Sequence, residues 1–327
     1  MLHSSKARTL TPTLAVLASL GLGACNRPDS EAARAADTRA MAESAAVYER
    51  EVAMFRKVGE TPNLQGPESA KYDRDLDVWF VANINGQPLG KDNNGYISRL
   101  RPDGTPYQVK FIESGKKGVT LNAPKGMAIN GDTLWVADID VARAFNKRTG
   151  APIANVNLKG KAKFLNGATV GPDGAIYMTD TGVLAGKGGQ FDHPGPDQVF
   201  RITRGGATVA LATPKMEGPN GIAWDAQRRQ FVIVDFLGKG IHGWKPGEKD
   251  VTTIGTGPGQ QDGVEVLPDG RILTTSWADS SLFVLENGKV SKVGSGIPSP
   301  ADLGYDGKSR VLVPLLMENR VELWELP

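Results

Sequence analysis

The chain has 327 residues, with 38 Lys and Arg against 36 Asp and Glu, so its formal net charge is only +2. This balance does not provide the strongly basic surface that nucleic acid binding requires, and we expect no nucleic acid partner. The 40 glycines and 21 prolines make the chain rich in turns, which favours many short strands over long helices.

The N-terminus has the features of a secretory signal. A short basic region, residues 6–8, precedes an apolar stretch, residues 14–22, that is too short to span a bilayer. Residues 22–25, Leu-Gly-Ala-Cys, resemble the lipobox of bacterial lipoprotein precursors, in which the cysteine is lipidated and becomes the first mature residue. Cys25 is the only cysteine, so no internal disulfide can form. We expect residues 1–24 to be a lipoprotein signal peptide and Cys25 to carry lipid; an ordinary secretory signal with a chance cysteine is the alternative.

The residues after the cysteine predict where the protein is held. Asn26 stands where Asp would favour inner-membrane retention, so the same resemblance implies the outer membrane, facing the periplasm. We expect membrane contact through the lipid anchor only. Residues 25–53 are rich in Ala and charge, which is typical of a tether. The folded domain would then occupy residues 54–327.

A strand–turn–strand unit recurs six times in this domain. Its copies begin at Gly66, Ala123, Phe164, Gly218, Gln260 and Ser299. Turns such as Pro172-Asp173-Gly174 join the two strands of a unit, because Asp-Gly supplies the positive φ that a tight hairpin needs. Equivalent positions recur at intervals of 39 to 57 residues, a period typical of propellers. We predict an all-β fold, a six-bladed β-propeller with four antiparallel strands per blade.

The two ends of the domain predict how the propeller closes. The last unit is followed by residues 321–326, which can supply only a third strand to its blade. A further strand, residues 54–58, is left over at the start of the domain. Pairing the two would complete the last blade and remove an exposed edge.

One position of each unit is expected at the central axis. The first strand of a blade lines the channel, so the six equivalent turns entering these strands form a ring at one mouth. The ring positions are Glu68, Lys125, Asn166, Asn220, Asp262 and Ala301, with Asp302 one residue further on. Two carboxylates about 4 Å apart repel by roughly 4 kcal/mol at an effective dielectric near 20. A divalent cation would remove this repulsion, and carboxylate and amide oxygens suit Ca²⁺.

Two other interpretations of the ring remain open. The Lys125 ammonium could neutralise a carboxylate with no metal present. The pairs Asn166-Gly167 and Asn220-Gly221 could be ordinary turns, although turns do not explain Glu68 and Asp262 at the same register. The chain has only three histidines, which argues against a His-rich zinc site.

From about residue 62 to the C-terminus the chain resembles the senescence-marker-protein, gluconolactonase and luciferin-regenerating-enzyme family of six-bladed propellers. The motifs that carry the resemblance are Glu68, Leu165-Asn166-Gly167, Pro219-Asn220-Gly221 and Gln261-Asp262-Gly263. The resemblance implies that Glu68, Asn166, Asn220 and Asp262 hold one divalent cation, Ca²⁺ or else Zn²⁺ or another ion. It also implies that Asp262 is the general base of lactone hydrolysis. The family's substrate-contacting Arg is Phe164 here, so the identity of the substrate is not carried over.

Two long connections, residues 83–94 and 182–197, are expected on the same face as the ring. Both are rich in Gly, Pro and polar residues, as active-site loops often are. The second carries His193, a candidate acid, base or ligand; the alternative is a solvated loop histidine. With Lys125 and Asp302 it completes the candidate pocket residues.

Three acidic residues, Asp138, Asp180 and Asp235, end second strands on the same face. We expect them to cap turns. His242 lies between outer strands and is expected at the surface.

Two classes of function are compatible with these features. The chain has no Gly-x-Ser-x-Gly elbow, phosphate loop, HExxH or CxxC, which disfavours serine hydrolases, nucleotide enzymes and thiol redox enzymes. The first class is a metal-dependent hydrolase of a lactone or related ester, in which the cation polarises the carbonyl and Asp262 or a water at the cation delivers the nucleophile. The second is a non-catalytic propeller that binds a small ligand or an envelope protein. No oligomer is predicted.

Overall fold

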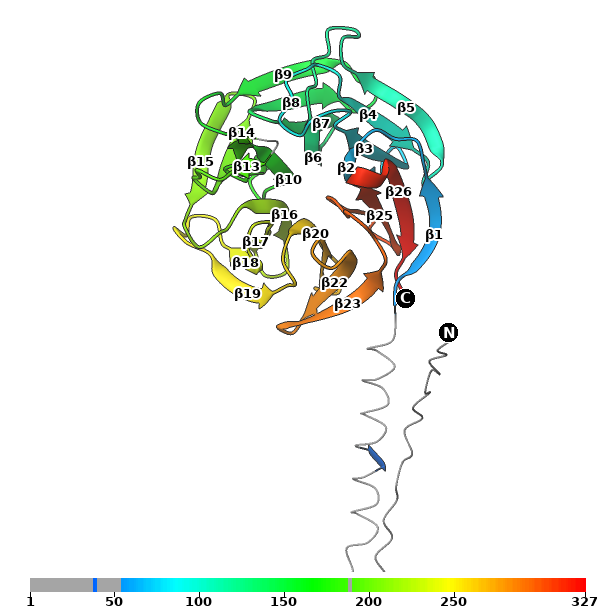
Figure 1. Cartoon of the computed structure of the whole chain (residues 1–327), viewed down its shortest axis with the longest axis vertical. Coiled ribbons are helices and arrows are strands. Elements are labelled where there is room, and N and C mark those ends of the chain that lie inside the picture. The colour runs from blue at the N-terminus through cyan, green and yellow to red at the C-terminus, as the bar shows by residue number, and fades with distance from the viewer. Residues whose placement is uncertain (1–37, 40–53, 188–189) are drawn as a thin grey trace, which may run out of the picture. The chain divides into compact units, whose positions relative to one another are not determined.

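The computed structural model describes residues 38–39, 54–187 and 190–327 (Figure 1). The predicted signal peptide, Cys25 and nearly all of the predicted tether lie outside the described residues. The chain divides into two compact units, Met1–Arg50 and Glu51–Pro327, and the strands described below belong to the second. In the described part of the chain no helix is both long and apolar enough to cross a membrane.

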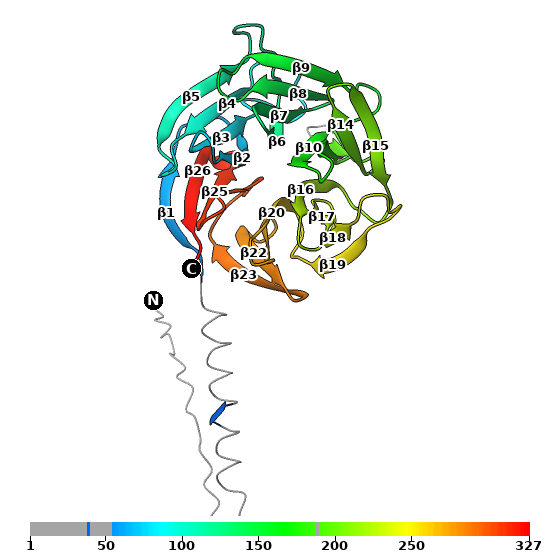
Figure 2. The same ribbon diagram turned by 180° about the vertical axis from the view of Figure 1, so that it is seen from behind.

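Six four-stranded antiparallel sheets, counted over residues 54–187 and 190–327, are arranged around a central axis as the blades of a propeller (Figures 1 and 2). Blades 1 and 2 consist of β2 (Pro67–Asp73), β3 (Val78–Asn83), β4 (Tyr96–Leu100), β5 (Pro106–Glu113), β6 (Pro124–Asn130), β7 (Thr133–Asp138), β8 (Val141–Asn146) and β9 (Pro152–Asn157). Blade 3 consists of β10 (Leu165–Val170), β11 (Ile176–Asp180), β14 (Gln198–Thr203) and β15 (Gly206–Ala212). The six-bladed prediction is confirmed.

The remaining blades follow the same order from the axis outward. Blades 4 and 5 consist of β16 (Pro219–Asp225), β17 (Gln230–Asp235), β18 (Gly240–Trp244), β19 (Thr252–Thr256), β20 (Gln261–Val266), β21 (Ile272–Ser276), β22 (Ser281–Glu286) and β23 (Lys289–Ser295). Blade 6 consists of β24 (Gly304–Tyr305), β25 (Arg310–Leu315), β26 (Arg320–Glu325) and β1 (Arg56–Thr61). Between β11 and β14 the chain forms a two-stranded hairpin, β12 (Leu184–Ala185) and β13 (Phe191–Asp192), and a short 3₁₀ helix, Leu316–Glu318, joins β25 to β26.

The predicted closure is confirmed, because β1 from the start of the domain pairs antiparallel with β26 and becomes the outermost strand of blade 6. Ion pairs join Arg56 to Glu325 at 2.5 Å and Lys57 to Glu322 at 2.8 Å. Just before β1, the Phe55 backbone N–H donates to a carbonyl of blade 5 at 2.7 Å, and its ring is buried. The first strand therefore ties the last two blades together.

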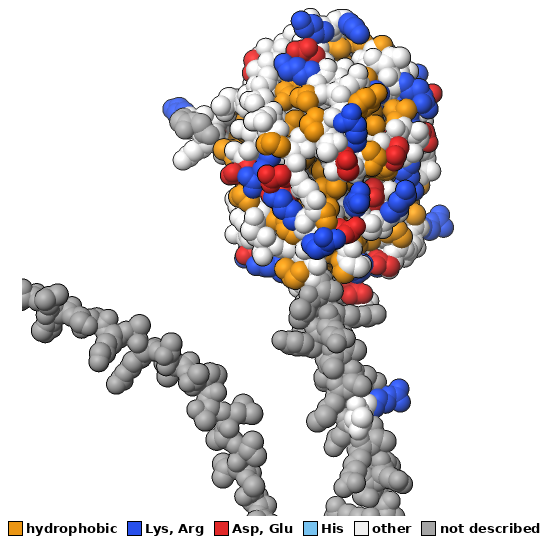
Figure 3. All heavy atoms as spheres, turned by 90° about the vertical axis from the view of Figure 1, so that its right-hand side faces the viewer, with side chains coloured by type: hydrophobic (Ala, Val, Ile, Leu, Met, Phe, Trp, Pro, Cys, Tyr) orange, Lys and Arg blue, Asp and Glu red, His pale blue; other side chains and the backbone are white. Residues whose placement is uncertain are grey.

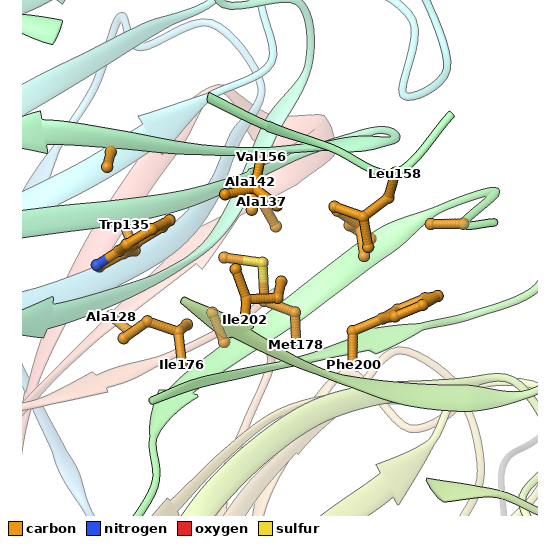
Figure 4. Close-up of a cluster of buried hydrophobic side chains, with 14 residues drawn as sticks. Ala128, Trp135, Ala137, Ala142, Val156, Leu158, Ile176, Met178, Phe200 and Ile202 are labelled. Atoms are coloured by element: carbon orange, nitrogen blue, oxygen red, sulfur yellow. The ribbon is translucent and has the colours of Figure 1, made fainter. Parts of the chain in front are cut away.

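Apolar clusters fill the interfaces between neighbouring blades. Figure 4 shows the one between blades 2 and 3, where Trp135 and alanines of β7 and β8 belong to the same cluster as Met178 and Phe200. The described residues form one such cluster at each of the six interfaces. Central strands of a blade are covered on both faces, which is why they are continuous apolar runs such as Val78–Asn83.

The outermost strands face solvent and alternate in polarity. Figure 3 shows the side on which β1 and β5 lie, where charged side chains of both signs are interspersed with apolar ones. The exposed apolar residues of these strands include Val58, Tyr107 and Val109. Single exposed apolar residues of this kind are ordinary on a soluble surface.

Candidate metal and active site

The ring residues lie at irregularities of the innermost strands. In β2 the pairing with β3 passes from Pro67 to Ser69 and leaves Glu68 out of register. The strands β6, β10, β16 and β20 show the same shift, each around its ring residue and the glycine that follows. A bulge removes a residue from the ladder and re-aims its side chain. Five blades therefore present a ring side chain by the same local device.

The glycine that follows four of the ring residues, Lys125, Asn166, Asn220 and Asp262, has a packing role. A Cβ on Gly126 would lie 2.3 Å from the backbone oxygen of Asn166, and one on Gly167 would lie 2.4 Å from that of Asn220. Neither Asn-Gly pair is a turn, since both lie inside strands, and neither Gly167 nor Gly221 has a positive φ. The interpretation of these pairs as turns is therefore wrong. The glycines let neighbouring innermost strands approach each other at the level of the ring.

Four ring residues keep a buried side-chain oxygen that has no hydrogen-bond partner among the described residues. These atoms are Glu68 Oε2, Asn166 Oδ1, Asn220 Oδ1 and Asp262 Oδ1. Each residue is only 3 to 5% exposed. Leaving a buried polar atom unsatisfied costs about 1–3 kcal/mol, so four at equivalent positions need a common explanation. Two carboxylate and two amide oxygens are a donor set for a hard divalent cation, and the residues fit such an ion.

The amide oxygens are essential to this assignment. In the described part of the chain, no group of three or more His, Cys, Asp and Glu side chains is arranged to hold a metal. A cation at the ring therefore depends on Asn166 and Asn220 as well as on the two carboxylates. The Asn166 amide is oriented by its Nδ2, which donates to Thr181 Oγ1 at 3.1 Å and so leaves Oδ1 free.

The carboxylates of the ring oppose each other's ionisation. Burial raises the pKa of Glu68 well above its usual range, and the charge of Asp262 raises it further, while Lys125 acts in the opposite direction. Burial and the charge of Asp302 likewise raise the pKa of Asp262, against a smaller opposing effect of the Trp277 indole N–H. Without a cation, burial and the neighbouring carboxylates therefore favour the protonated forms of Glu68 and Asp262.

Asp302 lies beside this pair and joins the first blade to the last. Its backbone N–H donates to the Glu68 carbonyl at 2.8 Å, and its Oδ2 accepts from Ser69 Oγ at 2.7 Å. Burial raises its pKa to about 6, while the charge of Lys71 lowers it. The preceding ring position, Ala301, offers no polar side chain.

The Lys125 ammonium is buried but is held by backbone rather than by a carboxylate. Its Nζ donates to the carbonyls of Pro88 and Ala123, both at 2.9 Å, and lies 4.3 Å from the centre of the Phe164 ring. Burial lowers its pKa to about 8, although Glu68 raises it. Among the described residues no ion pair joins Lys125 to a ring carboxylate. It lies near the ring without neutralising it by direct contact.

Among the described residues, no hydrogen bond or ion pair joins His193 to a ring residue. Its Nε2 lies 2.7 Å from Asp197 Oδ1, and Asp197 Oδ2 accepts from the backbone N–H of Gly218 at the entry to β16. The side chain is about one-third exposed. The structure brings His193 together with Asp197 and not with the ring residues.

Two of the strand-ending aspartates position ring residues. Asp138 accepts from the backbone N–H of Ala123 at 2.8 Å, and Asp180 accepts from that of Phe164 at 2.8 Å. These contacts fix the entries to β6 and β10, which carry Lys125 and Asn166. The capping prediction is confirmed for Asp138 and Asp180, and the repeated Asp at strand ends is the sequence signal for it.

The expectation for His242 was wrong. The residue is 3% exposed, and its Nε2 lies 2.8 Å from Asp235 Oδ2. The third strand of a blade is covered by neighbouring blades, and Asp235 supplies the partner that a buried imidazole needs. Asp235 therefore holds a side chain rather than the entry to a strand.

Comparisons with known proteins concern the family and the fold. The sequence profile described as the SMP-30/Gluconolactonase/LRE-like region matches residues 67–299. No curated protein sequence matches the chain. A gluconolactonase from Xanthomonas campestris is similar in structure with a TM-score of 0.59 and 14% identity, covering 84% of this chain and 95% of that one. A streptogramin B lyase is similar with a TM-score of 0.56 and 14% identity, covering 84% of this chain and 97% of that one. At such identity the two structures show a shared fold alone.

Proposed function

Because the chain belongs to the SMP-30/gluconolactonase/LRE-like family, we propose that it is a divalent-metal-dependent hydrolase of a lactone or related ester. The observation that carries the proposal is a set of four buried oxygens that accept no hydrogen bond from any residue the structure describes; Glu68, Asn166, Asn220 and Asp262 contribute them. Carboxylate and amide oxygens favour Ca²⁺, and Zn²⁺ is the main alternative.

The ring residues would have distinct parts in the reaction. The cation, when bound, supplies polarisation of the substrate carbonyl. Asp262 accepts the proton of the attacking water; in the protein without metal, burial and the charge of Asp302 raise the pKa of its carboxyl, which favours proton acceptance. Lys125 places a positive charge beside the site that favours negative charge developing on the substrate.

The test combines elemental analysis with activity. Purified protein should contain about one divalent cation per chain, and a panel of lactones and simple esters should include substrates whose hydrolysis stops on chelation and returns on adding the ion. Absence of any bound divalent cation would contradict the metal assignment. A bound cation with no turnover of the whole panel would favour a propeller that binds a small ligand or an envelope protein.

We also propose that Cys25 carries lipid and anchors the protein in the bacterial outer membrane, facing the periplasm. The lipobox at residues 22–25 and the lack of any other cysteine support this proposal. Cys25→Ser should release the protein from membranes into the soluble periplasmic or secreted fraction, as measured by fractionation without detergent. A variant that stays with the membranes would show that lipid is not what holds it.

A further inference from the structure

A groove of about 400 Å³ opens on the face of the propeller that carries the ring. Its apolar wall is formed by Leu89, Ile139, Ala162, Leu184 and Ala185. These residues come from connections of blades 1, 2 and 3, including the β12–β13 hairpin. We call this groove the apolar groove. Two lysines, Lys91 and Lys163, also line the groove, and Lys91 is paired with Asp140 at 2.6 Å, which neutralises its charge.

The apolar groove is connected to the ring through short links. Ile139 accepts the backbone N–H of Leu165 at 2.7 Å, and Leu165 directly precedes Asn166. On another side, Leu89 follows Pro88, whose carbonyl accepts from the buried Lys125. A molecule with its carbonyl at the ring therefore has this groove next to it.

Phe164 places an aromatic ring between Lys125 of the ring positions and the β12–β13 hairpin. The residue is 8% exposed, and its ring meets that of Phe191 edge-on at 6.0 Å. Phe191 is about half exposed on β13 and pairs in register with Ala185 of the groove wall. An aromatic surface thus runs from the exposed hairpin down to the residue two before Asn166.

We propose that the substrate of the ring is an ester or lactone bearing an alkyl or acyl chain, and that this chain lies in the apolar groove. The inference rests on the proposed function and adds the class of substrate. A polyhydroxylated lactone would leave hydroxyls against methyl and aromatic groups, which is costly when no hydrogen bond replaces water. A hydrocarbon chain gains about fourfold in binding for each buried methylene, equivalent to about 0.8 kcal/mol.

The first measurement compares kcat/KM for γ-butyrolactone, γ-decalactone and glucono-δ-lactone, each corrected for its hydrolysis by hydroxide. We expect γ-decalactone to be preferred over γ-butyrolactone by at least about tenfold, from the burial of two or more methylenes. Equal rates for the short and long lactones, or a preference for glucono-δ-lactone, would overturn the inference while leaving the proposed hydrolase in place.

A matched pair of variants locates the chain-binding site. Leu184 lines the groove and Leu237 lies outside it on the β17–β18 turn, and the two are similarly exposed at 43% and 48%. Leu184→Ser should remove most of the preference for γ-decalactone without changing kcat/KM for γ-butyrolactone. Leu237→Ser should change neither value. If both variants lower the preference equally, the chain does not lie in the groove.

A binding measurement separates this inference from the proposed function. If no lactone is hydrolysed, the proposed function fails. The groove can then still be tested by calorimetric titration of γ-decalactone into protein treated with chelator. Binding of γ-decalactone with a negative heat-capacity change, lost in Leu184→Ser and kept in Leu237→Ser, supports the groove. No binding, or binding unaffected by Leu184→Ser, overturns it.

Discussion

At the scale of single residues, the two carboxylates of the ring have different surroundings. Asp262 lies near Asp302 and Trp277, which shift its pKa in opposite directions, whereas Glu68 is opposed by Asp262 and attracted by Lys125. The nearest positive side chain therefore favours the ionised form of Glu68, as suits a permanent ligand. The charge of the neighbouring Asp302 raises the pKa of Asp262, which favours proton acceptance there.

This difference predicts unequal effects of two conservative changes. Asp262→Asn keeps the shape and one ligand oxygen but removes the base, so it should lower kcat by about 10²-fold or more while changing metal affinity little. Glu68→Gln should weaken metal binding first. Calorimetric titration of the metal and steady-state kinetics check both. An Asp262→Asn variant that hydrolyses substrate at the parent rate would show that another group is the base.

The crowded carboxylates also predict how stability depends on pH in protein stripped of metal. Asp302 has a pKa of about 6 in the folded state, above the value of about 3.9 expected in the unfolded chain. The folded state therefore binds this proton more tightly, and stability is present below about pH 4 and lost as pH rises through about 6. The loss is roughly 2–3 kcal/mol.

Asp302→Asn should remove that loss. Compared with the parent, the metal-free variant should gain thermal stability at pH 7.5 and gain little at pH 4, as measured by scanning calorimetry at both values. Adding the cation should shrink the gain at pH 7.5, because the ion offsets the same repulsion. An equal gain at both pH values would mean that the carboxylate charge is not responsible.

At the scale of the strand, a bulge and a glycine act together in β6, β10, β16 and β20. The bulge frees the side chain from the ladder, and the glycine lets the next innermost strand come close. A methyl group on Gly126 would meet the Asn166 backbone oxygen, which no side-chain rotation can relieve. The position of the ring oxygens is thus set by contacts between backbones.

Gly126→Ala should therefore destabilise the protein by about 3 kcal/mol or more, since the overlap can be relieved only by shifting a strand. Gly59→Ala is the matched control, because it is also a strand glycine without positive φ, and its added Cβ would contact neighbours only at 3.7 Å. Its effect should be within about 1 kcal/mol of zero. Urea unfolding of both variants measures the difference. Similar losses in the two would indicate that backbone proximity at the ring is not limiting.

The strand scale also shows which features the sequence could predict. The blades and their order follow from the repeat, because a turn signal and two apolar runs recur wherever a blade begins. The roles of Gly167 and Gly221 do not follow, since an Asn-Gly pair favours a hairpin turn when only neighbouring residues are considered. Contact with the next blade decides against the turn. The burial of His242 was missed for the same reason, because neighbouring blades cover the third strand of its blade.

At the scale of the whole propeller, stability depends on closing the circle of blades. The apolar clusters of the described residues lie at six interfaces, so every blade is covered on both sides only if the first and last blades meet. β1 completes blade 6, and Phe55 fills the cluster between blades 5 and 6. Losing this segment would expose the edge of β26 and remove a buried aromatic ring.

Two truncations test the closure. Removing residues 1–53 keeps Phe55 and β1 and should leave a single cooperative unfolding transition. Removing residues 1–61 deletes both and should lower Tm by about 10 °C or more, or cause aggregation through the uncovered edge. Scanning calorimetry and light scattering of the two proteins measure this. Equal Tm values would show that the outermost strand of blade 6 is dispensable.

The close approach of the innermost strands at glycine has a consequence for how this architecture changes over evolutionary time. Because adjacent backbones at the axis are in contact, a substitution that displaces one ring oxygen displaces its neighbours, and few such changes can be accepted singly. The connections above the mouth have no such restriction and can lengthen, shorten or change polarity one at a time. Descendants of such a chain would therefore acquire new substrates by remodelling these surface segments, while the chemistry performed at the axis is inherited unchanged.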